Sequence, residues 1–412
     1  MSHTPRHRST RRAALAMLVM ALVGATPVTA APPPAAANAA VITTWNSVAA
    51  ATIPANPAAF LNYALVHLAM YNAVVGITGE YEQYQWSAPA PHNASPEAAA
   101  AAAAHRVLVT YFPAAQEALD AQLVASLALI PDGGPQDKGI AYGIRAADRI
   151  IALRANDGRF AAVTVPTADA PGEYAGPFAV PWLGGVTPLA LSSLQQLDPG
   201  SPPALGTAQY RAELEEVRTL GAANSAVRTE AQTLTARYFA DVPFGPMEAA
   251  LRDLAGRRAL DISDSARLFA GTNTAIADAL GTVWNDKLRT MWWRPISAIR
   301  ETFDDGDALT VADPEWTPLI NTPPYPEWPS GLCAVISALT SSLVELTGGV
   351  DLNLISPSQG LRHWDSKLGL DNLAVEARIW SGIHFRTADM VSLGIGNNTA
   401  NWTFDHYFAP TD

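Results

Sequence analysis

Apolar residues recur at helical spacing along most of the chain. In residues 57–75, PAAFLNYALVHLAMYNAVV, they lie three and four positions apart, which predicts a buried helix. A second helix is expected to begin at Ser95, because Pro96 suits its first turn and an alanine-rich run follows. The same spacing predicts helices over 113–130, 136–157, 207–222, 225–240, 262–293, 332–347 and 371 to about 400, the last with a break. Alternating strand patterns of useful length are absent from the sequence, so the expected fold is all-α.

The first 30 residues resemble an export signal rather than part of the fold. Four arginines precede the apolar run AALAMLVMALVGA, and the small residues VTA come just before Ala31. The apolar run is too short and too close to the N-terminus for a typical membrane span. The stretch STRRAAL also matches a twin-arginine signal, which would mean export in the folded state. The sequence therefore predicts an exported protein with a signal peptide over residues 1–30. It does not decide whether export follows the twin-arginine route.

The remainder is expected to form a flexible linker followed by one domain. Residues 31–40, APPPAAANAA, are predicted to be the linker, and residues 41–412 a single all-α domain. Its length favours two four-helix-bundle-like halves, with a core that the 49% of hydrophobic residues can fill. Residues 157–205 are rich in Pro and Gly and predict a long ordered excursion between helices.

Charge and cysteine content narrow the classes of partner. The net charge of −12 becomes about −16 without the signal's four arginines, which argues against nucleic acid or an anionic membrane as a partner. Outside the signal, no membrane span is expected. Cys333 is the single cysteine, so an internal disulfide is excluded and a buried structural thiol is expected. The sequence does not indicate an oligomeric state.

The first stretch with candidate chemistry is KLRTMWWRP, residues 287–295. Lys287 and Arg294 are seven residues apart, which on one helix is about 20° less than two full turns. Both side chains would then lie on the same face of the helix. Pro295 disfavours helix at Arg294 and predicts that the helix ends there. Solvated cations at a helix end are the simpler interpretation. The apolar bulk between them instead suggests a buried face, where cations need an anion.

The second stretch is PSGL, residues 329–332. Ser330 can cap the helix that follows, and this plain cap is the simpler interpretation. Gly331 would let a ligand approach the backbone closely. The free N–H groups at a helix start also favour a phosphate-like oxyanion.

The third stretch is ARIWSGIHFRTAD, residues 377–389. Arg378 and His384 would not align on an ideal helix, but Ser381-Gly382 between them could break it and bring them together. An arginine fork suits oxyanions, and a neutral histidine can ligate a metal or act as a nucleophile. A packed histidine and a salt-bridged arginine are the structural alternative.

In this order, Lys-(x)6-Arg-Pro, Pro-Ser-Gly and Arg-(x)5-His resemble the signature of the type 2 phosphatidic acid phosphatase superfamily. Within it, the chain is similar to the bacterial vanadium-dependent haloperoxidases, a similarity that VHLAMYNAVV and TPPYPEWPSG strengthen. The resemblance extends from about residue 41 to 408. It implies an all-α fold built from a pair of four-helix bundles.

The resemblance also implies residue roles and a cofactor. His384 would bond to vanadium, or attack phosphorus as in the phosphatases. Vanadate is the implied cofactor, phosphate could occupy the same pocket, and altered chemistry could dispense with vanadium. The groups that would hold the oxygens of vanadate or phosphate are Lys287, Arg294, Ser330, the Gly331 N–H and Arg378. Fixed donors of this kind stabilise an oxyanion without reorganisation during reaction.

Two positions depart from the family pattern. The family's Pro-Ser-Gly-His histidine is Leu332 here, and leucine can neither donate nor accept a proton. General acid–base help is worth about 10²–10⁴-fold, so halide oxidation should be weakened or lost unless another group substitutes. His363 is a candidate substitute on residue type alone. The acid that orients the histidine in many relatives is Ala388 here, with Asp389 one residue late.

The predicted function is that of a haloperoxidase-family enzyme that keeps the oxyanion pocket and lacks one acid–base histidine. It would catalyse a non-redox rearrangement of a small natural product, such as an α-hydroxyketone or acyl shift. A working vanadium haloperoxidase, an acid phosphatase and a non-catalytic oxyanion-binding protein remain alternatives. Four aromatic residues are candidates for an apolar substrate pocket, with core packing as the alternative, namely Trp292, Trp293, Trp328 and Phe385.

Overall fold

The computed structural model describes residues 34–168, 170–300 and 310–411. These residues form thirteen α-helices, two short 3₁₀-helices and one two-stranded sheet, so the predicted all-α class is confirmed. The predicted signal peptide lies outside the described residues. Residues 34–411 fall within one compact unit, which contains the whole candidate site.

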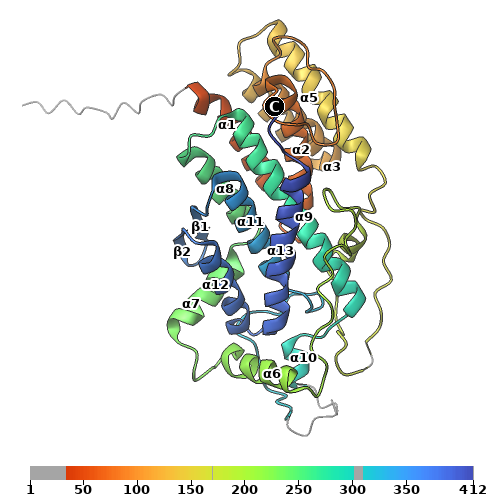
Figure 1. Cartoon of the computed structure of the whole chain (residues 1–412), viewed down its shortest axis with the longest axis vertical. Helices are drawn as coiled ribbons and strands as arrows, with labels where there is room; N and C mark the ends of the chain where they lie inside the picture. The colour runs from red at the N-terminus through yellow and green to blue at the C-terminus, as the bar shows by residue number, and fades with distance from the viewer. Residues whose placement is uncertain (1–33, 169, 301–309, 412) are drawn as a thin grey trace, which may run out of the picture. The chain divides into compact units, whose positions relative to one another are not determined.

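One group of helices comes from the N-terminal half of the chain. α2 (Ala59–Thr78), α3 (Pro96–Tyr111) and α5 (Gly134–Leu153) pack together, and α2 also packs along the long α9 (Ile262–Thr290) (Figure 1). Helices that contact members of this group are α1 (Pro34–Thr52), α4 (Gln116–Leu127) and α8 (Gly245–Arg257). Among the described helices, α2 is the one long and apolar enough to cross a membrane, and 83% of its apolar window is buried in the protein.

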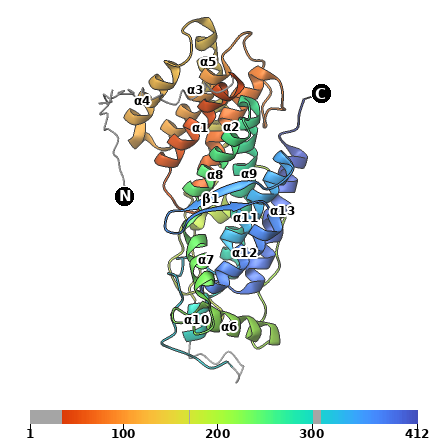
Figure 2. The same ribbon diagram turned by 90° about the vertical axis from the view of Figure 1, so that its left-hand side faces the viewer.

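A second group comes from the C-terminal half. α11 (Gly331–Thr347), α12 (Lys367–Trp380) and α13 (Arg386–His406) lie side by side, away from α3, α4 and α5 (Figure 2). α9 packs against both α11 and α13, so it belongs to this bundle as well as to the first. The two predicted bundles are therefore present and share a helix. The remaining helices are α6 (Ala208–Gly221), α7 (Glu230–Asp241) and α10 (Pro295–Arg300).

The structure differs from the sequence-based expectation in several places. Residues 34–40 of the predicted linker form the start of α1, because alanine favours helix and Pro34 suits a first turn. α8 and the short α10 were not predicted. An antiparallel hairpin of β1 (Leu352–Ser356) and β2 (Gly360–Trp364) follows α11, and its five-residue strands are too short for a clear alternating pattern.

One buried carboxylate holds part of the Pro- and Gly-rich excursion in place. Between α5 and α6, the described residues contain one regular element, the 3₁₀-helix η2 (Pro181–Gly185). Asp278 of α9 accepts hydrogen bonds from the N–H groups of Leu189, Ala190 and Leu191 at 2.7, 2.6 and 2.9 Å. These bonds compensate the burial of the carboxylate and fix the excursion against α9. This agrees with the expected ordered excursion.

α11 and α13 approach closely at a glycine, and this approach positions the two segments that carry Ser330 and His384. A Cβ atom added at Gly396 would lie 2.2 Å from the Ala334 carbonyl oxygen and 2.6 Å from the Ala338 nitrogen. Both atoms belong to the backbone of α11, so a side chain cannot be accommodated without moving the helix. Gly394 on the same helix is exposed, and a Cβ atom there would meet no atom within 4 Å.

We therefore expect Gly396→Ala and Gly394→Ala to have opposite effects on the free energy of unfolding. Gly396→Ala should destabilise the protein by about 1–3 kcal/mol or more, because overpacking forces the helices apart. Gly394→Ala should be neutral or stabilising by about 0.5–1 kcal/mol, because alanine favours helix. Urea unfolding of the two variants beside the unmodified protein measures both effects. Equal stability of the two variants would contradict the close approach.

Candidate functional site

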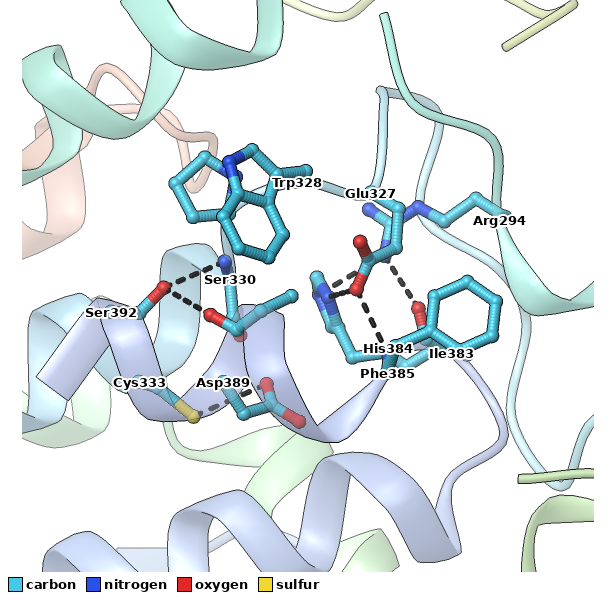
Figure 3. A network of polar contacts seen from close by, with 12 residues as sticks. Arg294, Glu327, Trp328, Ser330, Cys333, Ile383, His384, Phe385, Asp389 and Ser392 are labelled. Atoms are coloured by element: carbon cyan, nitrogen blue, oxygen red, sulfur yellow. Dashed lines mark hydrogen bonds and ion pairs between the residues drawn. The ribbon is translucent and has the colours of Figure 1, made fainter. Parts of the chain in front are cut away.

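Three segments far apart in the sequence meet at the candidate site. They are the end of α9, the loop that leads into α11, and the turn between α12 and α13 (Figure 3). α9 ends at Thr290, where Met291 adopts a left-handed conformation with φ 44°. Arg294 therefore lies beyond the helix, and the prediction that Lys287 and Arg294 share a helix face is wrong. The two cations are instead brought together by their bonds to the loop before α11.

The predicted break between Arg378 and His384 is confirmed. α12 ends at Trp380, Ser381 is its C-cap, and Gly382 has φ 77°. A Cβ atom at Gly382 would lie 2.5 Å from the Gly221 carbonyl oxygen, so this turn requires glycine. The turn leaves Arg378 in the last turn of α12 and His384 just before α13, and both line one cavity.

A buried carboxylate orients His384. Glu327 Oε1 lies 2.8 Å from His384 Nδ1 and accepts a hydrogen bond from the Phe385 N–H at 3.0 Å (Figure 3). On the other side of the ring, Arg294 Nη1 lies 3.0 Å from His384 Nε2. Arginine can only donate, so Nε2 is the acceptor and Nδ1 carries the proton that is donated to Glu327. His384 is thus a neutral imidazole with the lone pair on Nε2.

The electrostatic surroundings favour the neutral histidine. Burial lowers the pKa of His384 well below its usual value, and the charges of Arg294, Arg378 and Lys287 lower it further. Burial raises the pKa of Glu327 to about 8, against the opposing effect of the Arg294 and Lys287 charges. Both shifts have the same main cause, because Glu327 and His384 are almost completely excluded from solvent.

Lys287 holds the loop that carries the Pro-Ser-Gly stretch. Its Nζ donates to the carbonyl oxygens of Pro326, Glu327 and Pro329 at 2.6, 2.8 and 2.6 Å. An ammonium group has three donors, and these bonds use all of them. Burial also lowers the pKa of Lys287 well below its usual value. In this arrangement Lys287 fixes the loop and has no donor left for an oxyanion.

Other donors at the site are open. Arg378 is buried and has no hydrogen-bonded partner among the described residues, and Arg294 Nη2 has none either. Ser330 occupies the cap position of α11, but its hydroxyl makes no capping bond, so the plain-cap interpretation is wrong. Gly331 begins α11, where backbone N–H groups lack partners within the helix. Buried cations without partners are costly unless an anion compensates them.

An apolar cavity of about 330 Å³ opens onto Arg378 and His384. Leu332 and Gly331 form part of its wall. The cavity has few polar side chains, so a ligand there would place apolar groups against the wall and polar groups at Arg378 and His384. The aromatic residues that line it are Phe60, Phe239, Phe244, Trp284 and Tyr325.

The aromatic residues predicted for the substrate pocket lie elsewhere. Trp292, Trp293, Trp328 and Phe385 are not among the residues that line the cavity. Trp293, Trp328 and Phe385 are buried in the core, and the Trp292 ring packs edge-on against Tyr210. The sequence placed them near the motifs, but the backbone directs them into the protein.

His363 does not replace the missing histidine. It lies on β2, its side chain is 54% exposed, and its Nδ1 lies 2.9 Å from Asn353 Oδ1 on the neighbouring strand. It is not among the residues that line the cavity. The prediction of His363 as a substitute acid is therefore wrong, because the hairpin holds it at the surface.

Asp389 contacts Cys333 instead of His384. Cys333 Sγ donates to Asp389 Oδ1 at 3.4 Å, and both residues are buried, as expected for a structural thiol (Figure 3). Burial raises the pKa of the thiol well above its usual value. Asp389 therefore does not orient His384, and Glu327 does.

Glu327 is the functional residue that sequence reasoning missed. It stands in PEWPSG, three residues before Ser330, as the one charged residue of a stretch that is otherwise apolar or small. A charge in such a stretch is a weak signal of a buried, paired group. Its partner could not be named, because the loop geometry that aims it at His384 depends on Lys287.

Comparisons with known proteins agree with this architecture. Residues 267–412 match the family model of the VCPO second helical-bundle domain. A crystal structure described as the first bacterial vanadium-dependent iodoperoxidase superposes with a TM-score of 0.76 at 20% identity, covering 93% of this chain and 99% of that one. A holo-type bacterial vanadium-dependent chloroperoxidase superposes with a TM-score of 0.70 at 14% identity, covering 85% and 91%.

The apo-type structure of a bacterial vanadium-dependent chloroperoxidase gives the same TM-score of 0.70 at 14% identity, covering 84% of this chain and 92% of that one. Comparison with curated proteins gives no match. The structural likenesses extend over both bundles, whereas the family model covers the segment that contains the three motifs. The chain therefore has the fold of the bacterial vanadium-dependent haloperoxidases, and its residues 267–412 match the VCPO second helical-bundle domain.

Proposed function

We propose that the chain is an enzyme that catalyses a non-redox rearrangement of a small apolar organic substrate, such as an α-hydroxyketone or acyl shift. The observation that carries this proposal is the arrangement of Glu327, His384 and Arg378 at the wall of an apolar cavity. It combines an oriented neutral base with a buried cation that has no hydrogen-bonded partner in the part of the chain that the structure describes. Such a pair can remove a proton from a substrate hydroxyl and stabilise the oxyanion that forms.

The residues divide this work between them. The lone pair of His384 Nε2 faces Arg294 Nη1, so a substrate hydroxyl would displace that donor before Nε2 accepts its proton. Glu327, in its ionised form, would stabilise the imidazolium that results. Arg378, Arg294 and the Ser330 hydroxyl would hold the developing oxyanion with donors that are already in place. Removal of one such donor typically costs about 10²–10³ in rate. The aromatic walls would exclude water from the reacting groups.

The same donors fit a tetrahedral oxyanion, so vanadate or phosphate could occupy the site. Arg294, Arg378, Ser330 and the Gly331 N–H would face its oxygens, and His384 Nε2 would face vanadium. Bound vanadate would supply the peroxide-dependent oxidation of halide. Leu332 offers no proton-transfer group to support that chemistry, which is why a non-redox reaction ranks first and a working haloperoxidase second.

Phosphate-ester hydrolysis is a further candidate that one observation favours. Glu327 orients His384 as an acid orients the nucleophile in the phosphatases, although Ala388 and Asp389 do not. The apolar Leu332 again leaves the leaving group without a proton donor at that position.

As part of the proposal, the signal-like residues 1–30 support export, and the substrate is a small molecule rather than a macromolecule.

The first prediction concerns the tautomer of His384. Nitrogen-15 spectra of histidine-labelled protein should show His384 with its proton on Nδ1, and His384→Gln identifies its signals. Glu327→Gln should keep this tautomer, because the amide oxygen can still accept from the ring and from the Phe385 N–H. Glu327→Ala should shift the population away from this tautomer, since the Nδ1 proton loses its acceptor and only the Arg294 donor at Nε2 still favours it. An unchanged tautomer in Glu327→Ala would show that Glu327 does not set it.

The second prediction concerns activity. Cyclic and aryl α-hydroxyketones, incubated without peroxide, halide or vanadate, should give isomers detectable by NMR. His384→Ala should lower the rate by about 10²–10⁴-fold, because it removes the base. His363→Ala, a change at an exposed histidine, should leave the rate unchanged.

Other outcomes of the same set of assays would replace this proposal. Bromination of a dye with vanadate and peroxide, without isomerisation, would identify a haloperoxidase. Hydrolysis of a chromogenic phosphate ester, lost in His384→Ala, would identify a phosphatase. Tight phosphate or vanadate binding with no turnover of any compound would identify a binding protein.

The third prediction concerns Leu332. Leu332→His should gain dye bromination by about 10²–10⁴-fold over the unmodified protein when both are loaded with vanadate, because it supplies an acid–base group at the pocket wall. Leu332→Met, which keeps an apolar wall, should gain nothing. Efficient bromination by the unmodified protein would contradict the assigned effect of Leu332. Bound vanadate without any gain in Leu332→His would show that more than one proton-transfer group has changed.

A further inference from the structure

The structure places a second buried carboxyl group beside the oxyanion donors. Asp389 lies in the first turn of α13 and is completely buried. Its Oδ1 accepts from the Cys333 thiol, a weak donor, and among the described residues its Oδ2 has no well-aligned hydrogen-bond partner. Figure 3 shows Asp389 and Cys333 on the Ser330 side of the site, with Glu327 and His384 on the other side.

We propose that Asp389 supplies the proton-transfer function that Leu332 cannot, by exchanging a proton with the bound oxyanion through the Ser330 hydroxyl. Asp389 would thus act as a relay residue, and Ser330 as the group that touches the oxyanion. This proposal rests on the proposed function, because it needs an oxyanion in the pocket. It differs from the expected role of an acid in this segment, since Asp389 does not hold the histidine.

The contacts of Ser330 support a relay. Its N–H donates to Ser392 Oγ at 2.7 Å, which fixes the backbone, while the side chain makes no capping bond. The hydroxyl lies close enough to Asp389 to lower the pKa of that carboxyl. Neither Ser330 Oγ nor Asp389 Oδ2 is engaged in a well-aligned hydrogen bond. A hydroxyl with one donor and two acceptor positions can therefore receive a proton from Asp389 as it donates one to a ligand.

The surroundings of Asp389 suit a group that changes protonation near neutral pH. Burial raises its pKa to about 7, and the charges of Arg378 and Arg386 oppose that rise. Below this pKa the carboxyl is protonated and can donate, and above it the carboxylate can accept. The ionisable groups that affect or contact it from α9, the loop before α11, α11, α12 and α13 are Lys287, Glu327, Cys333, Arg378 and Arg386. None of the described residues forms an ion pair with it within 4.0 Å.

The relay completes the proposed rearrangement. His384 Nε2 takes the proton of the substrate hydroxyl, and the resulting oxyanion forms a carbonyl group. A carbon–carbon bond to the former carbinol carbon breaks as a new bond forms to the neighbouring carbonyl carbon, whose oxygen becomes the new oxyanion. Ser330 gives its proton to that oxygen and receives the proton of Asp389. The substrate gains and loses one proton, so the step is an isomerisation with no oxidant or reductant. It leaves His384 protonated and Asp389 ionised, and proton exchange with water restores both groups before the next turnover.

Sulfate is a suitable probe, because it remains a tetrahedral dianion from pH 6 to 9. Calorimetric titration in buffers of different ionisation enthalpy measures the protons taken up with each sulfate. At pH 8 Asp389 is largely ionised in the free protein, and a bound dianion raises its pKa, so a proton is taken up. We expect the unmodified protein to take up at least half a proton more than Asp389→Asn at this pH.

Three further variants separate the relay from other effects. Ser330→Ala should bind sulfate more weakly and lose most of the Asp389-dependent uptake. Cys333→Ala should keep that uptake, because it leaves the relay in place. In a Glu327→Gln background, the substitution Asp389→Asn should still remove the same uptake, which separates Asp389 from the other buried carboxyl.

Each outcome decides a different part of the proposal. Sulfate binding with equal proton uptake in the unmodified protein and Asp389→Asn would overturn the role of Asp389 and leave the proposed oxyanion site standing. Undiminished uptake in Ser330→Ala would show that Asp389 senses the anion through space, and would overturn the relay. An absence of sulfate binding at pH 6 in the unmodified protein would overturn the oxyanion site itself.

Discussion

The buried ammonium group of Lys287 donates hydrogen bonds to three carbonyl oxygens of the loop that leads into α11. The position of nearly every other group at the site depends on this interaction. It sets the direction of Glu327, which in turn holds His384, and it sets the start of α11, where Ser330 and Gly331 present their donors. Loss of any one of these bonds would leave a buried carbonyl group without this donor, at a cost of about 1–3 kcal/mol. The loop is therefore fixed before any ligand arrives.

The helical architecture could be predicted from the sequence because it depends on local patterns. The spacing of apolar residues located most helices, and Ser381-Gly382 marked the break that brings Arg378 and His384 to one cavity. The end of α9 could not be predicted, because the left-handed conformation of Met291 has no local sequence signal. The hairpin was missed because each of its strands has five residues.

The candidate site could be predicted from the sequence only in part. The ordered motifs indicated an oxyanion pocket, but they could not show which donors are already engaged. Lys287 and Arg378 are both buried cations, yet the first is saturated by carbonyl oxygens and the second has no hydrogen-bonded partner among the described residues. The same holds for the acids, since Glu327 contacts His384 whereas Asp389 contacts Cys333. Such distinctions depend on loop geometry, which brings together residues separated by tens of positions.

α9 belongs to both helical groups, and this has a consequence for how the protein can be divided. The segment that matches the second-bundle family begins at residue 267, inside α9, whose first residue is Ile262. A cut at that boundary would separate the helix from its cap at Asp261 and remove α2, against which it packs. The homologous segment is thus not a portable module. A truncated or recombined form of this protein would therefore have to keep α9 together with α2 and with the helices of the second bundle.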